Sequence, residues 1–209
     1  INEEDLFLSV ARNYDDKDSA FDYEIFKASG DYLEDMDAFE NLYDIASDCG
    51  RLDIIASGDL GNIAKGLREF DDLIDFIDHI FLILPDAKKM DKEDLEDLDF
   101  ILASGIEIFA IDEKFAKKFT LDDEDLKKIK NSDPNLARIL ENYDKEALDS
   151  ALLLYLSQRP EAFIFDAAGL KVNFDEKTID HSSQRPKAYI ANKLNEESFY
   201  DYLRGVLCN

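Results

Sequence analysis

The chain has 209 residues, with 49 Asp and Glu against 24 Lys and Arg, so its formal net charge is −25 at pH 7. Such an acidic surface repels nucleic-acid phosphates and anionic lipid headgroups, so we expect neither direct nucleic-acid binding nor membrane association. Hydrophobic residues make up 45% of the sequence. That fraction is enough for a buried core, so the sequence predicts a folded acidic protein and not a disordered tail.

The cysteine content and the length of the apolar runs indicate the cellular location of the protein. Cys49 and Cys208 are the only cysteines, too few for a disulfide-stapled secreted fold. Residues 1–5 carry acids where a signal peptide needs basic residues. The longest apolar runs, at 80–84 and 151–156, are far shorter than the ~20 residues of a membrane helix. We therefore expect a soluble, cytoplasmic protein.

Between residues 23 and 112, short apolar runs typical of strands alternate with segments of helical period. The predicted strands are Tyr23–Lys27, Leu52–Ala56, His79–Leu84 and Ile106–Ile111. The predicted helices are Asp31–Ile45, Leu60–Ile77 and Lys92–Leu102. Strands joined by helices need right-handed crossovers, so this pattern predicts an α/β fold with a mainly parallel sheet flanked by helices on both faces.

The alternating pattern stops around Lys130–Pro134, which divides the chain into an α/β domain, 1–130, and an α-rich C-terminal subdomain, 131–209. Two short strands, Ala162–Phe165 and Leu170–Phe174, are predicted to form a hairpin that turns around Ala168-Gly169. Helical segments are predicted on either side of the hairpin, at 136–156 and 195–207.

Three small motifs sit at predicted junctions. Ala28-Ser29-Gly30-Asp31 and Ala56-Ser57-Gly58-Asp59 each follow a strand and precede a helix, where Gly permits a sharp turn and Asp caps the helix. Ala103-Ser104-Gly105 ends a helix, where Gly105 is expected as the C-cap. Capping accounts for these motifs without a ligand.

Acidic residues follow the predicted strands, at the edge where open parallel sheets bind ligands. These residues are Asp31, Asp59, Asp86 and Asp112. Converging carboxylates suit Mg²⁺, which supports phosphoryl chemistry. Asp112-Glu113-Lys114 also resembles the acid-x-Lys element of restriction-endonuclease-like nucleases. One hypothesis is therefore a Mg²⁺-dependent phosphoryl-transfer or nuclease-type enzyme.

An eight-residue pattern occurs twice near the C-terminus, at 157–164 and 183–190, with Ser-Gln-Arg-Pro followed by a short apolar run. In one interpretation, Pro begins each following strand and the apolar residues pack inward. In the other, Arg159 and Arg185, rare positive charges in an acidic chain, form a paired contact with an anion or a partner.

The favoured functional hypothesis rests on charge. Rows of acids on rigid helices, such as Asp71, Asp72 and Asp75, could engage a basic cleft of a protein partner, as an inhibitor or immunity protein does. The sequence thus favours a non-catalytic binding protein without a cofactor, with the Mg²⁺ enzyme as the alternative. A third possibility is that the charge only keeps the protein soluble.

Overall fold

The computed structural model describes residues 37–56, 60–118, 127, 160–195 and 198. Six strands form one sheet in the order β1-β2-β3-β6-β4-β5. Their bounds are β1 Leu52–Ala56, β2 Ile77–Leu84, β3 Glu107–Asp112, β4 Phe163–Asn173, β5 Thr178–His181 and β6 Lys187–Leu194. Strands β1, β2, β3 and β6 are parallel, whereas β4 is antiparallel to both β6 and β5. The predicted α/β fold with a mainly parallel sheet is confirmed.

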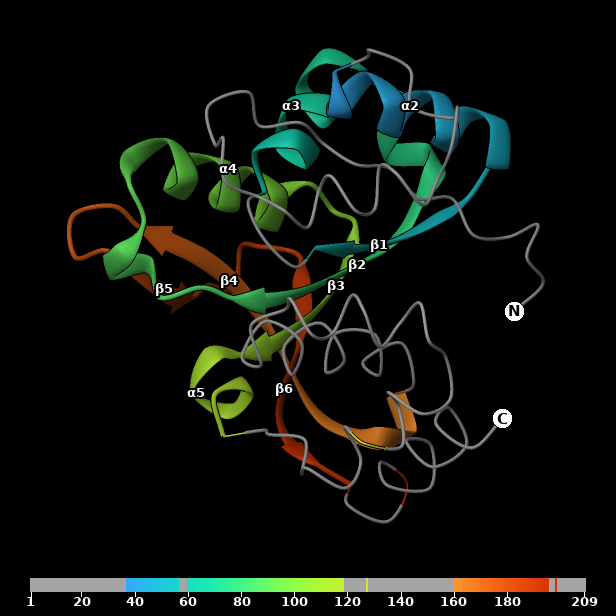
Figure 1. The fold of residues 1–209 in the computed structure, drawn as a ribbon. Coiled ribbons are helices and arrows are strands. Elements are labelled where there is room, and N and C mark those ends of the chain that lie inside the picture. The colour runs from blue at the N-terminus through green and yellow to red at the C-terminus, as the bar shows by residue number, and fades with distance from the viewer. Residues whose placement is uncertain (1–36, 57–59, 119–126, 128–159, 196–197, 199–209) are drawn as a thin grey trace.

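The helices in the described part of the chain are α2 Ala38–Cys49, α3 Gly61–Glu69, α4 Lys92–Ala103 and the short α5 Glu113–Ala116. Short 3-10 turns lie at η3 Leu73–Phe76, η4 Ala87–Lys89 and η5 Pro160–Ala162. Helices α2, α3 and α4 lie together on one face of the sheet (Figure 1). None of the described helices is long and apolar enough to span a bilayer.

The helix predicted over Leu60–Ile77 is wrong in its second half. Helix α3 ends at Glu69, and Phe70 has an extended backbone with φ −119° and ψ 98°. Asp71 and Asp72 follow in a turn, as expected for consecutive residues of poor helix propensity. The turn still carries Leu73 into the core, where it is fully buried. The apolar spacing had placed Ile74 on the buried face, but Ile74 is 37% exposed, so the spacing predicted neither the break nor the burial of the turn that follows it.

The predicted hairpin turn at Ala168-Gly169 is also wrong. Strand β4 passes through both residues, which pair with Ala188 and Lys187 of β6. The hairpin joins β4 to β5 instead, with Asn173 paired to Thr178. A Cβ on Gly169 would lie 2.0 Å from the carbonyl oxygen of Ser182, so Gly here permits a close approach of two backbones and not a turn.

Strand β6 comes from the far side of the predicted boundary at residue 130, yet it pairs with β3 through Ile108–Ala188 to Ile111–Ala191. The sheet thus contains strands from both sides of that boundary, and the domain division stays a prediction. The interpretation of Pro186 as a strand-starting residue agrees with β6 beginning at Lys187. Gly105 has φ 93°, as expected for the residue that ends α4 and leads into β3.

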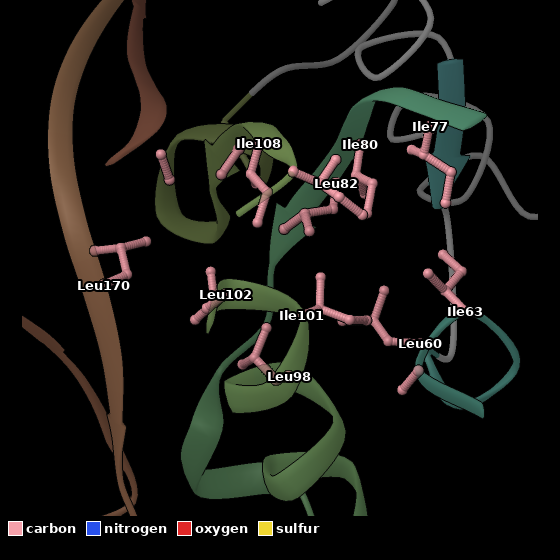
Figure 2. Close-up of a cluster of buried hydrophobic side chains, with 14 of the residues drawn as sticks. Leu60, Ile63, Ile77, Ile80, Leu82, Leu98, Ile101, Leu102, Ile108 and Leu170 are labelled. Carbon is pink, nitrogen blue, oxygen red and sulfur yellow. The ribbon is translucent and has the colours of Figure 1, made fainter. Parts of the chain in front are cut away.

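The main core lies between the sheet and helices α2–α4. Side chains of alternate residues on β2 and β3, including Ile80, Leu82 and Ile108, are buried against α4. Figure 2 shows Ile101 and Leu102 of α4 facing these strands, with Leu170 of β4 pointing toward Leu102. The far end of β4 therefore curls over α4 and closes this core.

Part of the opposite face of the sheet is buried as well. Phe81, Ile111 and Ala191, which point away from the α2–α4 layer, are each no more than 4% exposed. Phe81, Phe109 and Tyr189 form a stack across β2, β3 and β6, with ring centroids 5.3 and 5.1 Å apart. Burial on both faces explains why β2 and β3 are continuous apolar runs.

Candidate functional site at the carboxyl edge of the sheet

The carboxyl ends of β2 and β3 lie side by side, because Leu84 and Asp112 are partners in the parallel ladder. Asp86 follows β2 by two residues, and Asp112 is the last residue of β3. Open α/β sheets bind their ligands beyond this edge. The fold therefore brings two of the four predicted acidic residues to one edge, whereas Asp31 and Asp59 lie outside the described residues.

Both acids cap the turn that follows them. The Asp86 carboxylate accepts a hydrogen bond from the backbone N–H of Lys88 at 3.2 Å. The Oδ1 atom of Asp112 accepts one from the N–H of Phe115 at 3.1 Å. These contacts satisfy backbone donors at the start of η4 and α5.

Two lysines surround the third acid of this edge, Glu113. The Nζ atom of Lys89 lies 3.8 Å from Glu113 and 3.9 Å from Asp86. Lys117, one turn along α5, makes an ion pair with Glu113. The hydrogen bond to Glu113 raises the pKa of Lys117 above its ordinary 10.5. The carboxylates at this edge are therefore already engaged by backbone N–H groups and lysines.

Because these carboxylates already contact backbone N–H groups and lysines, few of their oxygen atoms remain for a cation to bind. Among the described residues, no group of three or more His, Cys, Asp or Glu side chains could hold a metal ion. The carboxyl edge of the sheet carries Asp86, Asp112 and Glu113. A cation bound there would have to compete with the ammonium groups of Lys89 and Lys117. These residues do not fit a metal centre by themselves.

The residues predicted to contact a partner lie elsewhere. Arg185 donates to Asp99 of α4 at 2.6 Å, and the two side chains are only 20% and 18% exposed. Its guanidinium thus joins the β5–β6 loop to α4. Arg159 lies outside the described residues.

The three predicted acids of the helical surface are placed around η3. Asp71 and Asp72 lie in the turn before it, and Asp75 lies within it. Asp72 accepts a hydrogen bond from the hydroxyl of Tyr43 at 3.1 Å. All three are exposed. They precede the amino end of β2, whereas Asp86 and Asp112 lie at the edge formed by the carboxyl ends of the strands.

No protein-family model matches the sequence, and no curated protein matches it by sequence. Solved structures do match its fold. A purine-preferring ribonucleoside hydrolase from Gardnerella vaginalis aligns with a TM-score of 0.65 at 16% identity, covering 84% of this chain and 66% of that one. A plant nucleoside hydrolase aligns with a TM-score of 0.61 at 15% identity, covering 83% and 67%.

A third match is the inosine-uridine preferring nucleoside hydrolase of Bacillus anthracis, with a TM-score of 0.61 at 12% identity, covering 90% of this chain and 73% of that one. The chain has the fold of nucleoside hydrolases. It spans about two thirds of the length of these enzymes. At this identity the likeness concerns the fold.

These matches correct the functional hypotheses drawn from sequence. The predicted non-catalytic partner of a basic protein surface is wrong, because the matching structures are catalytic hydrolases. The alternative, a Mg²⁺-dependent phosphoryl-transfer or nuclease-type enzyme, is unsupported by the same matches. The expectation of no cofactor, with Mg²⁺ as the alternative, is not supported by these matches to catalytic hydrolases either. Net charge misled the favoured hypothesis, because it describes a surface and not a site.

Sequence reasoning missed the lysines at the carboxyl edge. Glu113 and Lys117 are spaced i,i+4, which was a readable signal for a helical ion pair. The approach of Lys89 to Glu113 had no such signal, because it depends on β2 and β3 being neighbours in the sheet.

Proposed function

We propose that this chain is a nucleoside-hydrolysing enzyme that binds an uncharged nucleoside at the carboxyl edge of β1, β2 and β3. The observation that carries the proposal is the fold match, at TM-scores of 0.59 to 0.65, to four nucleoside hydrolases, three of which are named for inosine, uridine, guanosine or purine ribonucleosides. The acidic character of the chain is compatible with this substrate class, because a nucleoside carries no phosphate to be repelled by a net charge of −25.

Hydrolysis of an N-glycosidic bond adds water to the sugar carbon while the base departs with a proton. A carboxylate that accepts a proton from the attacking water accelerates this reaction. Asp112 is our candidate for that proton acceptor. Its Oδ1 atom caps α5, and its Oδ2 atom has no hydrogen-bond partner among the described residues. It also ends β3, which lies between β2 and β6 inside the sheet.

Calcium enters this proposal only as a group that would help to hold and activate water when bound. The described carboxylates at the edge do not form a site for it. We therefore assign no residue of the described chain to the metal. A cytoplasmic location is a further part of the proposal, supported by Cys49, which is exposed and carries a free thiol.

The test is release of free base and reducing sugar from inosine, uridine and guanosine, with calcium supplied and then chelated. Asp112→Asn keeps an oxygen that can cap α5, so the fold should persist while the rate falls by about 10²-fold or more. Asp75→Asn, at the opposite edge of the sheet, is the matched control and should leave the rate unchanged. No base release from any of the three nucleosides would overturn the proposed activity.

A further inference from the structure

A lysine of the β4–β5 hairpin reaches the loop that follows β2. The Nζ atom of Lys177 donates a hydrogen bond to the carbonyl oxygen of Met90 at 2.8 Å, in a partly buried position. Lys177 lies in the turn between β4 and β5, and Met90 directly follows η4. Figure 1 shows the hairpin tip beside the turn that follows β2. The contact therefore joins residues that are 87 positions apart in the sequence.

The backbone of Lys177 is strained. Its φ is 49°, in the left-handed region, and it is the only non-glycine residue with a positive φ among those that the structure describes. Glycine would adopt this conformation without a steric penalty. The turn is fixed on its other side by Asn173, whose Oδ1 atom accepts a hydrogen bond from the N–H of Glu176 at 3.2 Å. A long side chain at a strained position indicates that its contact has a role.

The loop that receives this contact, residues 85–91, carries two charged side chains to the carboxyl edge of the sheet. Asp86 follows β2 by two residues. The Nζ atom of Lys89 lies 3.9 Å from Asp86 and 3.8 Å from Glu113, the residue after Asp112. These ion pairs are long and the Lys89 side chain is 68% exposed, so they hold its ammonium weakly. The place of Lys89 beside Glu113 therefore depends on the backbone of the loop.

The two halves of this backbone are held differently. In the first half, the N–H of Lys89 donates to the carbonyl of Asp86 at 2.8 Å, and the Ala87 side chain is 4% exposed in the core. In the second half, the N–H of Met90 makes a longer bond, 3.3 Å, to the carbonyl of Ala87. The ammonium of Lys177 adds a charge-assisted hydrogen bond at this weaker end.

We propose that Lys177 is a positioning residue for ligand binding at the carboxyl edge. Through Met90 it holds the loop 85–91, and with it Asp86 and Lys89, at the edge where the nucleoside would bind. This inference rests on the proposed function. A loop that is already ordered loses less conformational entropy when a ligand binds, so the affinity is higher. The β4–β5 hairpin thus contributes to the site without contacting the ligand.

The first test measures the order of the loop by amide hydrogen exchange, followed by NMR. Lys177→Met keeps an apolar stem but removes the ammonium. We expect exchange at the N–H groups of Lys89 and Met90, both hydrogen-bonded within the loop, to accelerate by about tenfold. Lys177→Arg keeps a donor and should restore exchange to within about twofold of the intact chain. Lys171→Met, an exposed lysine on β4, is the matched control and should change nothing.

The second test measures steady-state kinetics with the nucleoside substrates. Lys177→Met should raise KM by about 3–10-fold and leave kcat within about twofold, because the loop must then be ordered when the ligand binds. A purely structural role would behave differently. Loss of folded protein lowers the apparent kcat and leaves KM unchanged. Lys177→Arg should recover the KM of the intact chain.

Two results would overturn the proposal. One is unchanged exchange at Lys89 and Met90 in the Lys177→Met variant, and the other is faster exchange with an unchanged KM. Lys177→Gly removes the same ammonium together with the backbone strain, so it gives the same answer if the methionine variant does not fold. If the intact chain hydrolyses no nucleoside, the proposed function fails separately, and hydrogen exchange still decides whether Lys177 holds the loop.

Discussion

The guanidinium of Arg185 lies 2.6 Å from Oδ2 of Asp99, and the other oxygen of that carboxylate accepts a hydrogen bond from the N–H of Val172 at 2.9 Å. One side chain of α4 thus binds both the loop before β6 and the curled end of β4. Both segments lie far from α4 in the sequence, and a single carboxylate joins them to the helical layer.

Loss of the Arg185–Asp99 contact should destabilise the fold. Arg185→Gln leaves the Asp99 carboxylate partly buried without its guanidinium, and we expect a cost of about 1–3 kcal/mol in the free energy of unfolding. Arg51→Gln breaks an ion pair whose arginine side chain is 76% exposed and should cost less than about 1 kcal/mol. Urea unfolding of both variants measures the difference. Equal costs would show that Arg185 is not a structural contact.

Gly169→Ala should disrupt the junction between β4 and the β5–β6 loop. The added methyl group would lie 2.0 Å from the carbonyl oxygen of Ser182 and 2.9 Å from that of Arg185, both backbone atoms that cannot move alone. We expect a loss of about 2–4 kcal/mol. Gly50→Ala is the control, because a Cβ there meets nothing within 4 Å and only the left-handed φ of 78° is strained, at about 1 kcal/mol. A Gly169 variant as stable as the control would refute the close approach.

The core between the sheet and α4 should be sensitive to cavities. Leu98 of α4 is fully buried, so Leu98→Ala should cost about 2–5 kcal/mol of unfolding free energy. Ile164→Ala removes an apolar side chain that is 48% exposed on β4 and should cost clearly less. Thermal or urea unfolding compares the two variants. Similar losses at both positions would contradict the placement of the core.

The carboxyl of Asp180 has a pKa below its ordinary 3.8, because Asn173 and then Thr178 donate hydrogen bonds to it at 3.1 and 2.9 Å. A lowered folded-state pKa means that this stabilisation is present above the unfolded-state pKa. It is lost as pH falls through the lowered value. The contribution is therefore complete at neutral pH and disappears only in acid.

Thr178→Val removes one of these donors while keeping the shape of the side chain. We expect the pKa of Asp180 to rise toward 3.8 in this variant, as measured by carboxyl NMR titration of the folded protein. Thr178→Ser, which keeps a hydroxyl, is the control and should keep the lower value. An unchanged pKa in the valine variant would mean that the hydroxyl of Thr178 does not stabilise the carboxylate.

Several elements could be read from the sequence because local pattern decides them. The strand Leu52–Ala56 was predicted with its observed bounds, and the helix at 92–102 was predicted to within one residue of α4. A strand buried on both faces has a continuous apolar run, and an amphipathic helix has apolar residues at three- and four-residue steps. Both patterns can be recognised in the sequence without knowledge of the tertiary structure. Helix α3 was predicted too long, because the helical spacing of apolar residues continues past its end to Ile74, which lies in η3, and to Ile77, which begins β2.

The candidate site was less accessible from sequence. The structure has Asp86 and Asp112 at the carboxyl edge, since a parallel sheet aligns strand ends, while their role as ligands stays a prediction. Their capping partners and the approach of Lys89 depend on which turns follow the strands. With 49 acidic residues in the chain, composition could not say which carboxylates are engaged.

By itself, the sequence determined the alternation of strands and helices, the acidic surface and the apolar positions of the core, because these depend on residue type and short-range spacing. Only the tertiary structure decided that β6 pairs with β3 and that the backbone of Gly169 closely approaches that of Ser182. It also decided that the ladder between β1 and β2 skips Asp78, which places Asp53 beside His79. Each of these is a contact between distant segments, and its register is set by packing the whole chain at once.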